Sequence, residues 1–173
     1  MVNKELKNAV IRKMKINIDT ITRASKELIG NIIRTPTIRS QHLSSEINGE
    51  VFLKLENLQY TSSFKVRGAY TSITRLKEEQ KKMGVIAMSA GNHAQAVAWW
   101  AKKERVNATI VMPEHAPLFK VMKTKSLGAD VILRGRTLNE SQTYVSELAN
   151  DKKLTLIHPY DDYNVVIGQG TLG

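Results

Sequence analysis

Lys65 stands where a helix is expected to begin. It belongs to the segment TSSFKVRGAY (61–70), after which apolar residues follow the spacing of one helix face: Val66, Ala69, Tyr70 and Ile73. An ammonium group near the positive end of a helix dipole is destabilised relative to the neutral amine, which lowers its pKa. A neutral amine can act as a base or as a nucleophile toward carbonyl compounds. Position alone favours a plainer interpretation, a surface lysine whose stem packs on Phe64.

A second segment, SAGNHAQAVA (89–98), joins an apolar run to a helical pattern. The backbone N–H groups of such a turn point above the carboxyl edge of a sheet, where ligands usually bind. Gly91 would let a ligand approach the backbone closely, and Asn92 offers an amide to a cofactor oxygen. The turn is therefore suited to a carboxylate. For His93 alone the sequence favours a simpler interpretation, in which Asn92 caps the helix and His93 is satisfied in the core.

The elements that position these residues follow a regular rhythm. Four apolar runs begin 22 to 24 residues apart: VIAMS (85–89), ATIVM (108–112), DVIL (130–133) and LTLI (154–157). Helical patterns lie between them, with Gly128 expected to end the second and Thr137 and Glu140 at capping-box spacing in the third. Alternation of strand and helix predicts an α/β fold, a four-stranded parallel open sheet with flanking helices and strands buried on both faces.

The chain before the sheet has a different pattern. Residues 18–33 have the periodicity of an amphipathic helix that ends before Pro36. The alternating run VFLKLE (51–56) predicts a strand, and the chain then turns into the loop that carries Lys65.

The composition excludes several classes of function. The 173 residues are 42% hydrophobic and 24% charged, as in ordinary globular proteins. There are no cysteines, so thiolate metal sites, disulfides and cysteine nucleophiles are excluded, and a cytoplasmic location is expected. No apolar run reaches the roughly 18 residues that a membrane-spanning helix needs.

The net charge of +10 could indicate a polyanionic partner. The basic residues, however, mostly close predicted helices, where they complement helix dipoles. Aromatic residues are only 6% and are not interleaved with the basic clusters as stacking platforms would be. Nucleic-acid binding is therefore disfavoured.

Two apparent motifs carry little weight. Gly168, Gly170 and Gly173 fit the dinucleotide pattern G-x-G-x-x-G, but that motif needs a following helix and an acidic residue about 20 positions later. Asp161 and Asp162 could suggest a metal pair, yet adjacent residues rarely point at one ion, and a turn after Pro159 explains them better. We therefore predict no metal site.

Four segments together resemble the motifs of one enzyme family. They are ENLQYTSSFKVRGA (56–69), SAGNHAQAVA (89–98), VMPEHAPLFK (111–120) and HPYDDYNVVIGQGT (158–171). Similar motifs, in this order and spacing, occur in threonine dehydratases. These are pyridoxal-phosphate (PLP) enzymes of fold type II, the tryptophan-synthase-β type, which also includes serine dehydratases and serine racemase. The resemblance extends from about Ile18 to the last residue.

The resemblance implies roles for individual residues. Lys65 would hold PLP as a Schiff base and then serve as the acid–base group at the substrate α-carbon. Phe64 would pack by the cofactor ring, and Asn92 would bond the phenolic oxygen. The substrate carboxylate would be received by Ser89, Ala90, Gly91, Asn92 and His93. In the catabolic members a nucleotide effector lies near the positions that match Tyr60, Thr61 and Gln95.

The chain departs from the family pattern in two respects. Family members usually have glycine at the position of Ser62, and a hydroxymethyl group there is expected to crowd substrate or effector, although serine can still cap a helix. Family members also continue with a glycine-rich phosphate-binding loop, a polar partner for the pyridine nitrogen, and the rest of a second domain. The 173 residues therefore look like an N-terminal fragment.

The resemblance also implies a division of the chain. A basic tail would cover 1–17, the N-terminal part of a large PLP domain 18–56, a small α/β domain 57–160, and a truncated return into the large domain 161–173.

The implied function is β-elimination from L-threonine or L-serine, giving 2-oxobutanoate or pyruvate and ammonia. An amino-acid substrate and a homo-oligomer of the complete protein are expected. For the 173 residues by themselves we expect weak activity or none. A rival hypothesis from another class is a non-catalytic remnant or interaction module.

Overall fold

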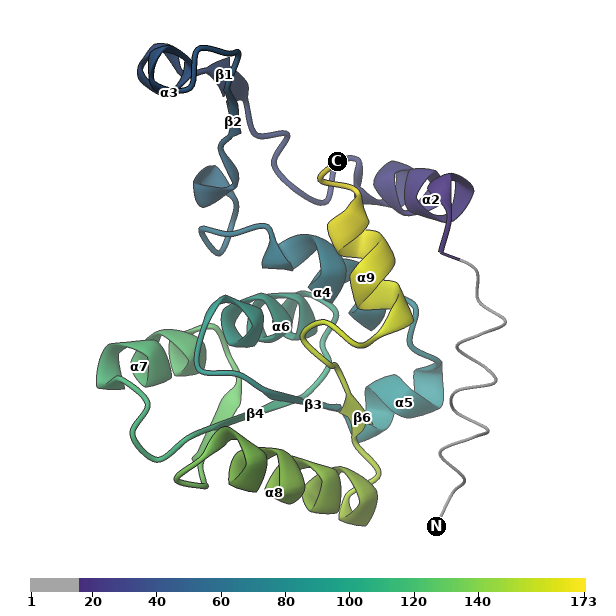
Figure 1. Cartoon of the computed structure of the whole chain (residues 1–173). Coiled ribbons are helices and arrows are strands. Elements are labelled where there is room, and N and C mark those ends of the chain that lie inside the picture. The colour runs from purple at the N-terminus through teal and green to yellow at the C-terminus, as the bar shows by residue number, and fades with distance from the viewer. Residues whose placement is uncertain (1–15) are drawn as a thin grey trace.

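The computed structural model describes residues 16–173 and contains the predicted parallel sheet (Figure 1). The predicted basic tail lies outside the described residues apart from its last two positions. The sheet order is β5-β4-β3-β6, and all neighbouring strands are parallel. The strands are β3 (Val85–Met88), β4 (Ala108–Met112), β5 (Asp130–Leu133) and β6 (Thr155–Leu156). The α/β fold class and the four strand positions predicted from the sequence are confirmed.

Burial differs between the central and the outer strands. Residues of β3 and β4 are almost all buried, whereas the ends of β5 are exposed and β6 is half-buried. The expectation that all four runs are buried on both faces is therefore wrong for the outer pair. Both outer strands lie at a sheet edge, so each has a neighbouring strand on one side only.

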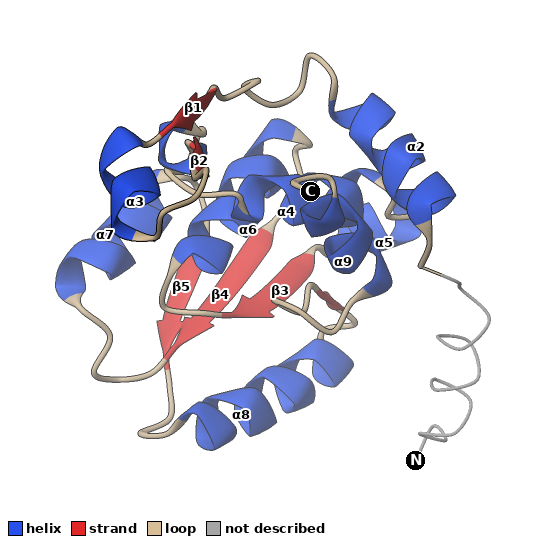
Figure 2. Ribbon diagram, turned by 45° about the horizontal axis from the view of Figure 1, so that its top comes forward, coloured by secondary structure: helices blue, strands red, loops and turns tan. Residues whose placement is uncertain are grey.

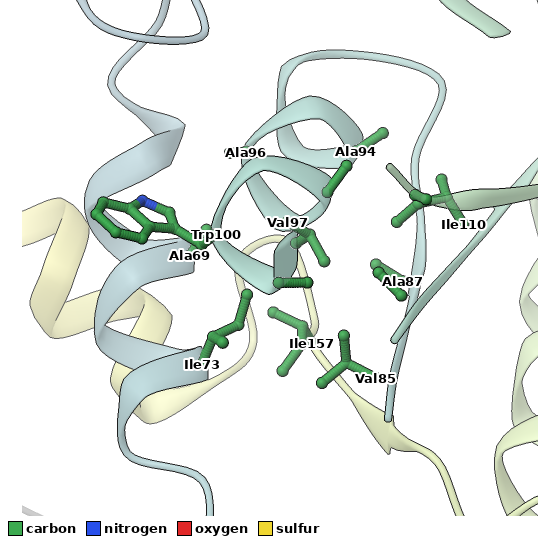
Figure 3. Close-up of a cluster of buried hydrophobic side chains, with 14 of the residues drawn as sticks. Ala69, Ile73, Val85, Ala87, Ala94, Ala96, Val97, Trp100, Ile110 and Ile157 are labelled. Atoms are coloured by element: carbon green, nitrogen blue, oxygen red, sulfur yellow. The ribbon is translucent and has the colours of Figure 1, made fainter. Parts of the chain in front are cut away.

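Helices cover both faces of the sheet (Figure 2). The helices that follow the three longer strands are α6 (Asn92–Lys103), α7 (Leu118–Ser126) and α8 (Leu138–Asp151). Alternate residues of a strand point to opposite faces. Accordingly, Ile86 and Val111 pack with Val145 of α8, whereas Val85 and Ile110 belong to the main core under α6. Figure 3 shows this main core.

A third layer of helices lies on α6. Helix α4 (Lys65–Thr74) packs between α6 and α9 (Tyr163–Gly170), and α2 (Ile18–Leu28) contacts both α4 and α9. The last residues thus form a helix against α4. Gly168 lies inside α9 and not in a turn between a strand and a helix, which agrees with setting the dinucleotide motif aside.

The N-terminal segment is more loosely organised. Asn17 caps α2, which ends at Leu28 rather than at the predicted residue 33, and Gly30 has a φ of 79°. Two short strands, β1 (Thr37–Arg39) and β2 (Phe52–Lys54), pair antiparallel on either side of α3 (Gln41–Glu46). The 3-10 helix η1 (Glu56–Leu58) leads toward α4, and α5 (Glu78–Met83) leads from α4 into β3. None of the described helices is long and apolar enough to cross a membrane.

Candidate active site

Lys65 is the first residue of α4, as predicted. Its Nζ donates a hydrogen bond to the carbonyl oxygen of Pro159 at 3.0 Å and lies 5.4 Å from the centroid of the Phe64 ring. The side chain is half-buried, and this burial lowers the pKa of Lys65. The sequence predicted a lowered pKa from the helix dipole, whereas the structure shows loss of solvent as the cause. Lys65 is therefore a partly desolvated amine beside an aromatic ring.

Ser62 explains why glycine suits the turn before Lys65. Its φ is 57°, in the left-handed region that side chains with a Cβ adopt at a cost. The side chain is exposed and does not cap α4, whose N-cap is Phe64 with no side-chain hydrogen bond. Serine is able to cap a helix, but Ser62 does not cap this one. Glycine at this position would remove backbone strain.

The turn before α6 is open to a ligand. Gly91 is the N-cap, no side chain caps the helix, and the Gly91 N–H donates to Ser89 Oγ at 3.1 Å. A Cβ added at Gly91 would meet only Ser89 Oγ, at 4.0 Å. Ala90 is half-buried against the main core. The prediction that Asn92 caps the helix is wrong, because Asn92 is the first helical residue and is exposed.

His93 lies in the core beneath this turn, as the simpler interpretation predicted. Its side chain is 3% exposed, and Nε2 lies 2.9 Å from the carbonyl oxygen of Ile157. Burial lowers the pKa of His93 to about 4. The imidazole is therefore neutral near pH 7, and its Nε2–H donates to Ile157. Its Nδ1 is buried without a partner among the described residues, so only one ring nitrogen is satisfied.

The residues after β6 bring the two helices together. Lys65 of α4 contacts Pro159, and His93 of α6 contacts Ile157. Trp100 also joins the helices, because its Nε1 donates to the carbonyl oxygen of Val66 at 2.8 Å. The candidate site is therefore formed where the first turns of α4 and α6 meet the segment between β6 and α9 (Figure 1).

The three predicted effector residues lie on two adjoining elements. The Tyr60 ring stacks on Trp99 of α6 at a centroid distance of 5.2 Å. Gln95 is buried on the same helix, one turn earlier. Thr61 is also buried, and its Oγ1 has no hydrogen-bond partner among residues 16–173. The structure thus places Tyr60 beside the helix that carries Gln95, and Thr61 is the next residue after Tyr60.

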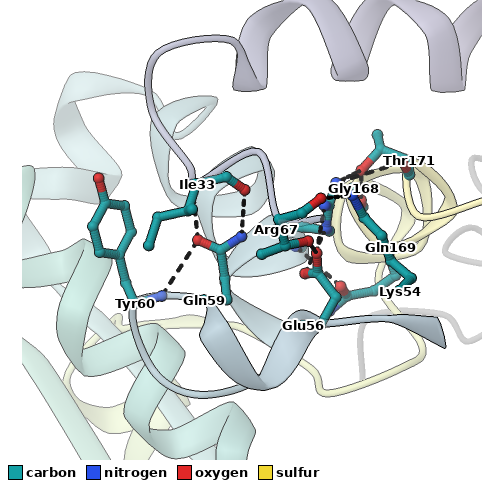
Figure 4. Close-up of polar contacts among 11 residues, drawn as sticks. Ile33, Lys54, Glu56, Gln59, Tyr60, Arg67, Gly168, Gln169 and Thr171 are labelled. Atoms are coloured by element: carbon teal, nitrogen blue, oxygen red, sulfur yellow. Dashed lines mark hydrogen bonds and ion pairs between the residues drawn. The ribbon is translucent and has the colours of Figure 1, made fainter. Parts of the chain in front are cut away.

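A buried polar network supports the start of α4 and was not predicted (Figure 4). Arg67 donates to both carboxylate oxygens of Glu56, at 2.9 and 2.8 Å, and Thr35 donates to Glu56 Oε1 at 2.6 Å. Burial alone would raise the pKa of Glu56, but the hydrogen bonds from Arg67 and Thr35 and the Arg67 charge lower it overall. Arg67 also donates to Thr171 Oγ1 at 3.1 Å. The only signal in the sequence was that Glu56 and Arg67 both belong to the family-like motif at 56–69.

Neither Lys65 nor the turn at 89–92 lines the cavity of about 630 Å³ between α2 and the end of the chain. That cavity is lined mainly by the end of α2 and residues 29–34, together with Arg67, Thr171 and Leu172. We assign the candidate site from the chemistry of Lys65 and the open turn, because cavity size by itself carries no chemical information. No group of three or more residues suited to hold a metal ion occurs in the part of the chain that the structure describes.

Comparison with known proteins identifies the family. Residues 28–173 match the model of the family described as "Pyridoxal-phosphate dependent enzyme". The match covers most of the chain, so the chain belongs to this family of PLP enzymes. Its parallel sheet and flanking helices are those of fold type II.

Individual relatives show which members of the family the chain resembles. The chain is 52% identical over 159 residues to L-threonine dehydratase catabolic TdcB of Staphylococcus aureus, and the match covers 91% of this chain and 46% of that protein. Among solved structures, maize serine racemase matches with a TM-score of 0.85 and 34% identity, over 90% of this chain and 47% of that one. The processed form of threonine deaminase isoform 2 from Solanum lycopersicum matches with a TM-score of 0.81 and 36% identity, over 91% and 45% respectively. The chain spans about half the length of the relatives it matches.

Proposed function

We propose that the chain supplies the cofactor-attaching part of a PLP-dependent ammonia-lyase that acts on L-threonine or L-serine. The products would be 2-oxobutanoate or pyruvate, together with ammonia. The observation that carries this proposal is the Lys65 amine, half-buried at the start of α4 with a lowered pKa. The 52% identity to a catabolic threonine dehydratase supports the choice of substrate class.

The residues present suit the cofactor. Lys65 offers an amine that is more easily deprotonated than a free lysine, as attachment to an aldehyde requires. Phe64 places an aromatic ring near the amine, where it can pack by the cofactor. The exposed Asn92 amide is available to a phenolic oxygen. When bound, PLP supplies an electron sink for the electron pair left at the substrate α-carbon.

The turn from Ser89 to His93 would receive the substrate carboxylate. Its helix has no side-chain cap, so the first-turn N–H groups of α6 are available to an anion. The open space at Gly91 allows the carboxylate to approach these groups. In this arrangement Lys65 accepts the α-proton on Nζ, and the carboxylate contacts fix the α-carbon beside it.

Regulation and assembly belong to the same proposal. A nucleotide could bind beside the stacked pair of Tyr60 and Trp99. Thr61 follows Tyr60, Gln95 lies one helical turn before Trp99, and both are buried. We also propose that the complete protein is a cytoplasmic homo-oligomer, as expected from the family resemblance.

The test of the proposal is covalent trapping. The chain is incubated with PLP, reduced with borohydride, digested and analysed by mass spectrometry. We expect the label on the peptide that contains Lys65 and its loss in Lys65→Ala. The matched control is Lys82→Ala, which removes an exposed lysine near the end of α5. Labelling spread evenly over exposed lysines, with none enriched at Lys65, would contradict the proposal.

Two neighbouring variants separate cofactor contact from support of the core. Asn92→Ala should weaken PLP binding and leave stability nearly unchanged, because Asn92 is exposed and its side chain does not cap α6. His93→Ala should lower the melting temperature, because it removes a buried ring and the bond to Ile157. PLP titration and thermal melts measure the two effects. Weaker PLP binding in His93→Ala than in Asn92→Ala would contradict these assignments.

A non-catalytic interaction module is the rival function, and one observation favours it. The β1–β2 ribbon exposes the apolar side chains of Ile38, Phe52 and Leu53. A two-stranded ribbon is only marginally stable by itself, so a partner that covers these side chains would stabilise it. Such a module would bind a protein partner without specific labelling of Lys65. The trapping experiment therefore separates the two functions.

A further inference from the structure

The turn after β6 is closed by a side chain. The N–H groups of Asp161 and Tyr160 donate to Nδ1 of His158, at 2.8 and 3.4 Å. Within the described part of the chain, residues 158–161 make no hydrogen bond between two main-chain groups. The His158 imidazole is thus the acceptor that closes this turn.

Both ends of the turn are fixed to other elements. His93 of α6 bonds the carbonyl oxygen of Ile157 just before it. Asp162 follows it and caps α9, accepting from the Val165 N–H at 2.9 Å and from Ser72 Oγ of α4 at 3.4 Å. The direction of the carbonyl group in the middle of the turn therefore depends on how His158 folds residues 159–161.

That carbonyl group belongs to Pro159 and receives the hydrogen bond from Lys65 Nζ at 3.0 Å. A lysine side chain has four rotatable bonds, so an amine without a fixed acceptor samples many positions. Attack on an aldehyde and transfer of an α-proton both require the amine in one place. The Pro159 carbonyl oxygen supplies such a fixed acceptor.

We propose that His158 is a positioning residue, whose Nδ1 holds the turn so that the Pro159 carbonyl oxygen orients the Lys65 amine. This inference rests on the proposed attachment of PLP at Lys65. Because two N–H groups point at Nδ1, this ring nitrogen acts as an acceptor. The ring also packs edge-on against Tyr160, with centroids 4.5 Å apart. His158 thus has a packing role and an acceptor role, which two variants can separate.

His158→Phe keeps an aromatic ring against Tyr160 and removes the acceptor. His158→Asn removes the ring, but its side-chain oxygen can accept from the N–H groups two and three residues later, as in an Asx turn. If the acceptor matters, the Asn variant behaves like the original chain and the Phe variant does not. If only packing matters, the Phe variant behaves like the original chain and the Asn variant does not.

The readout is borohydride trapping of PLP, taken as the ratio of labelled Lys65 peptide to labelled Lys82 peptide. We expect this ratio to fall by about tenfold in His158→Phe and to stay within about twofold of the original chain in His158→Asn. Circular dichroism and thermal melts should show both variants folded. Amide hydrogen exchange at Asp161 should quicken in the Phe variant alone.

The outcomes are distinguishable. An unchanged ratio in His158→Phe, or an equal fall in both folded variants, overturns the positioning role and leaves the proposed function intact. No enrichment at Lys65 in the original chain overturns the proposed function, and this inference with it.

Discussion

Among the described residues near Lys65, His93 has the most strongly shifted pKa, and its side chain is buried and neutral. Its pKa is lowered from 6.5 to about 4, mainly by burial, so the unfolded chain binds a proton more readily than the folded one. Between these two values the unfolded state gains protons first, and folding stability decreases as the pH falls. The contribution is fully present above pH 6.5 and is lost progressively toward pH 4.

We therefore expect the free energy of unfolding to drop by about 2 kcal/mol between pH 7 and pH 5 through His93 alone. Urea unfolding at the two pH values measures the drop. His93→Gln is the matched control, because its amide can still donate to Ile157 but does not titrate. Equal pH dependence of the two proteins would show that His93 does not contribute.

Ser62 provides a second prediction at this scale. Its φ of 57° is in the region where glycine has no steric penalty. Ser62→Gly should raise the free energy of unfolding by about 0.5–1 kcal/mol, since relief of strain exceeds the added entropy of the unfolded chain. Ser146→Gly is the control, because Ser146 lies in the interior of α8 and its replacement should be destabilising. A destabilised Ser62→Gly would indicate that the serine hydroxymethyl group makes a stabilising contact.

At the scale of elements, the close crossing of α4 and α9 depends on glycine. A Cβ added at Gly168 would lie 2.6 Å from Thr71 Oγ1, 2.7 Å from the Arg67 carbonyl oxygen and 2.7 Å from the Gly68 Cα. Two of these atoms are backbone, so the helices would have to separate. The glycines of the apparent dinucleotide motif thus include one that serves helix packing.

Gly168→Ala should accordingly destabilise the chain by about 1–3 kcal/mol and lower the melting temperature by several degrees. The control is Gly49→Ala, where an added Cβ would have no neighbour nearer than 3.6 Å. Thermal melts of the two variants give the comparison. Equal melting temperatures would mean that α9 shifts on α4 without cost.

At the scale of the whole molecule, the chain spans about half the length of its relatives, as shown by 46% coverage of the S. aureus threonine dehydratase. A PLP phosphate contributes to binding through several charge-assisted hydrogen bonds, each worth roughly 1.5–3 kcal/mol. The family resemblance implies a glycine-rich loop for this phosphate beyond the matched segments. Without that loop, the described residues would hold the cofactor by Lys65, the Phe64 ring and the Asn92 amide.

We therefore expect the 173 residues alone to release 2-oxo acid from threonine or serine far more slowly than a complete family member. Loose placement of the reacting groups is the physical reason. The measurement is a coupled assay of 2-oxo acid with PLP added, and a complete threonine dehydratase serves as the positive control. Turnover close to that of the control would show that the 173 residues suffice for activity.

The sequence by itself determined the features set by local periodicity. Apolar runs placed β3 and β4, the spacing of Val66, Ala69 and Ile73 identified the face of α4 that joins the main core, and Gly128 ended α7 as expected. These patterns depend on contacts within one element and on burial of one face, which are encoded in neighbouring residues. The family motifs then singled out Lys65 and the turn at 89–93.

Only the tertiary structure decided which distant groups meet. Lys65 and Pro159 are 94 positions apart, and Arg67 and Thr171 are 104 apart. Periodicity along one element carries no information on such pairs, because they depend on how helices cross and where loops pass. For the same reason the sequence did not predict the Glu56 network, the helix packing at Gly168 or the turn that His158 closes. The proposed chemistry of the site thus comes from the family motifs, whereas its geometry follows from the packing of α4, α6 and α9.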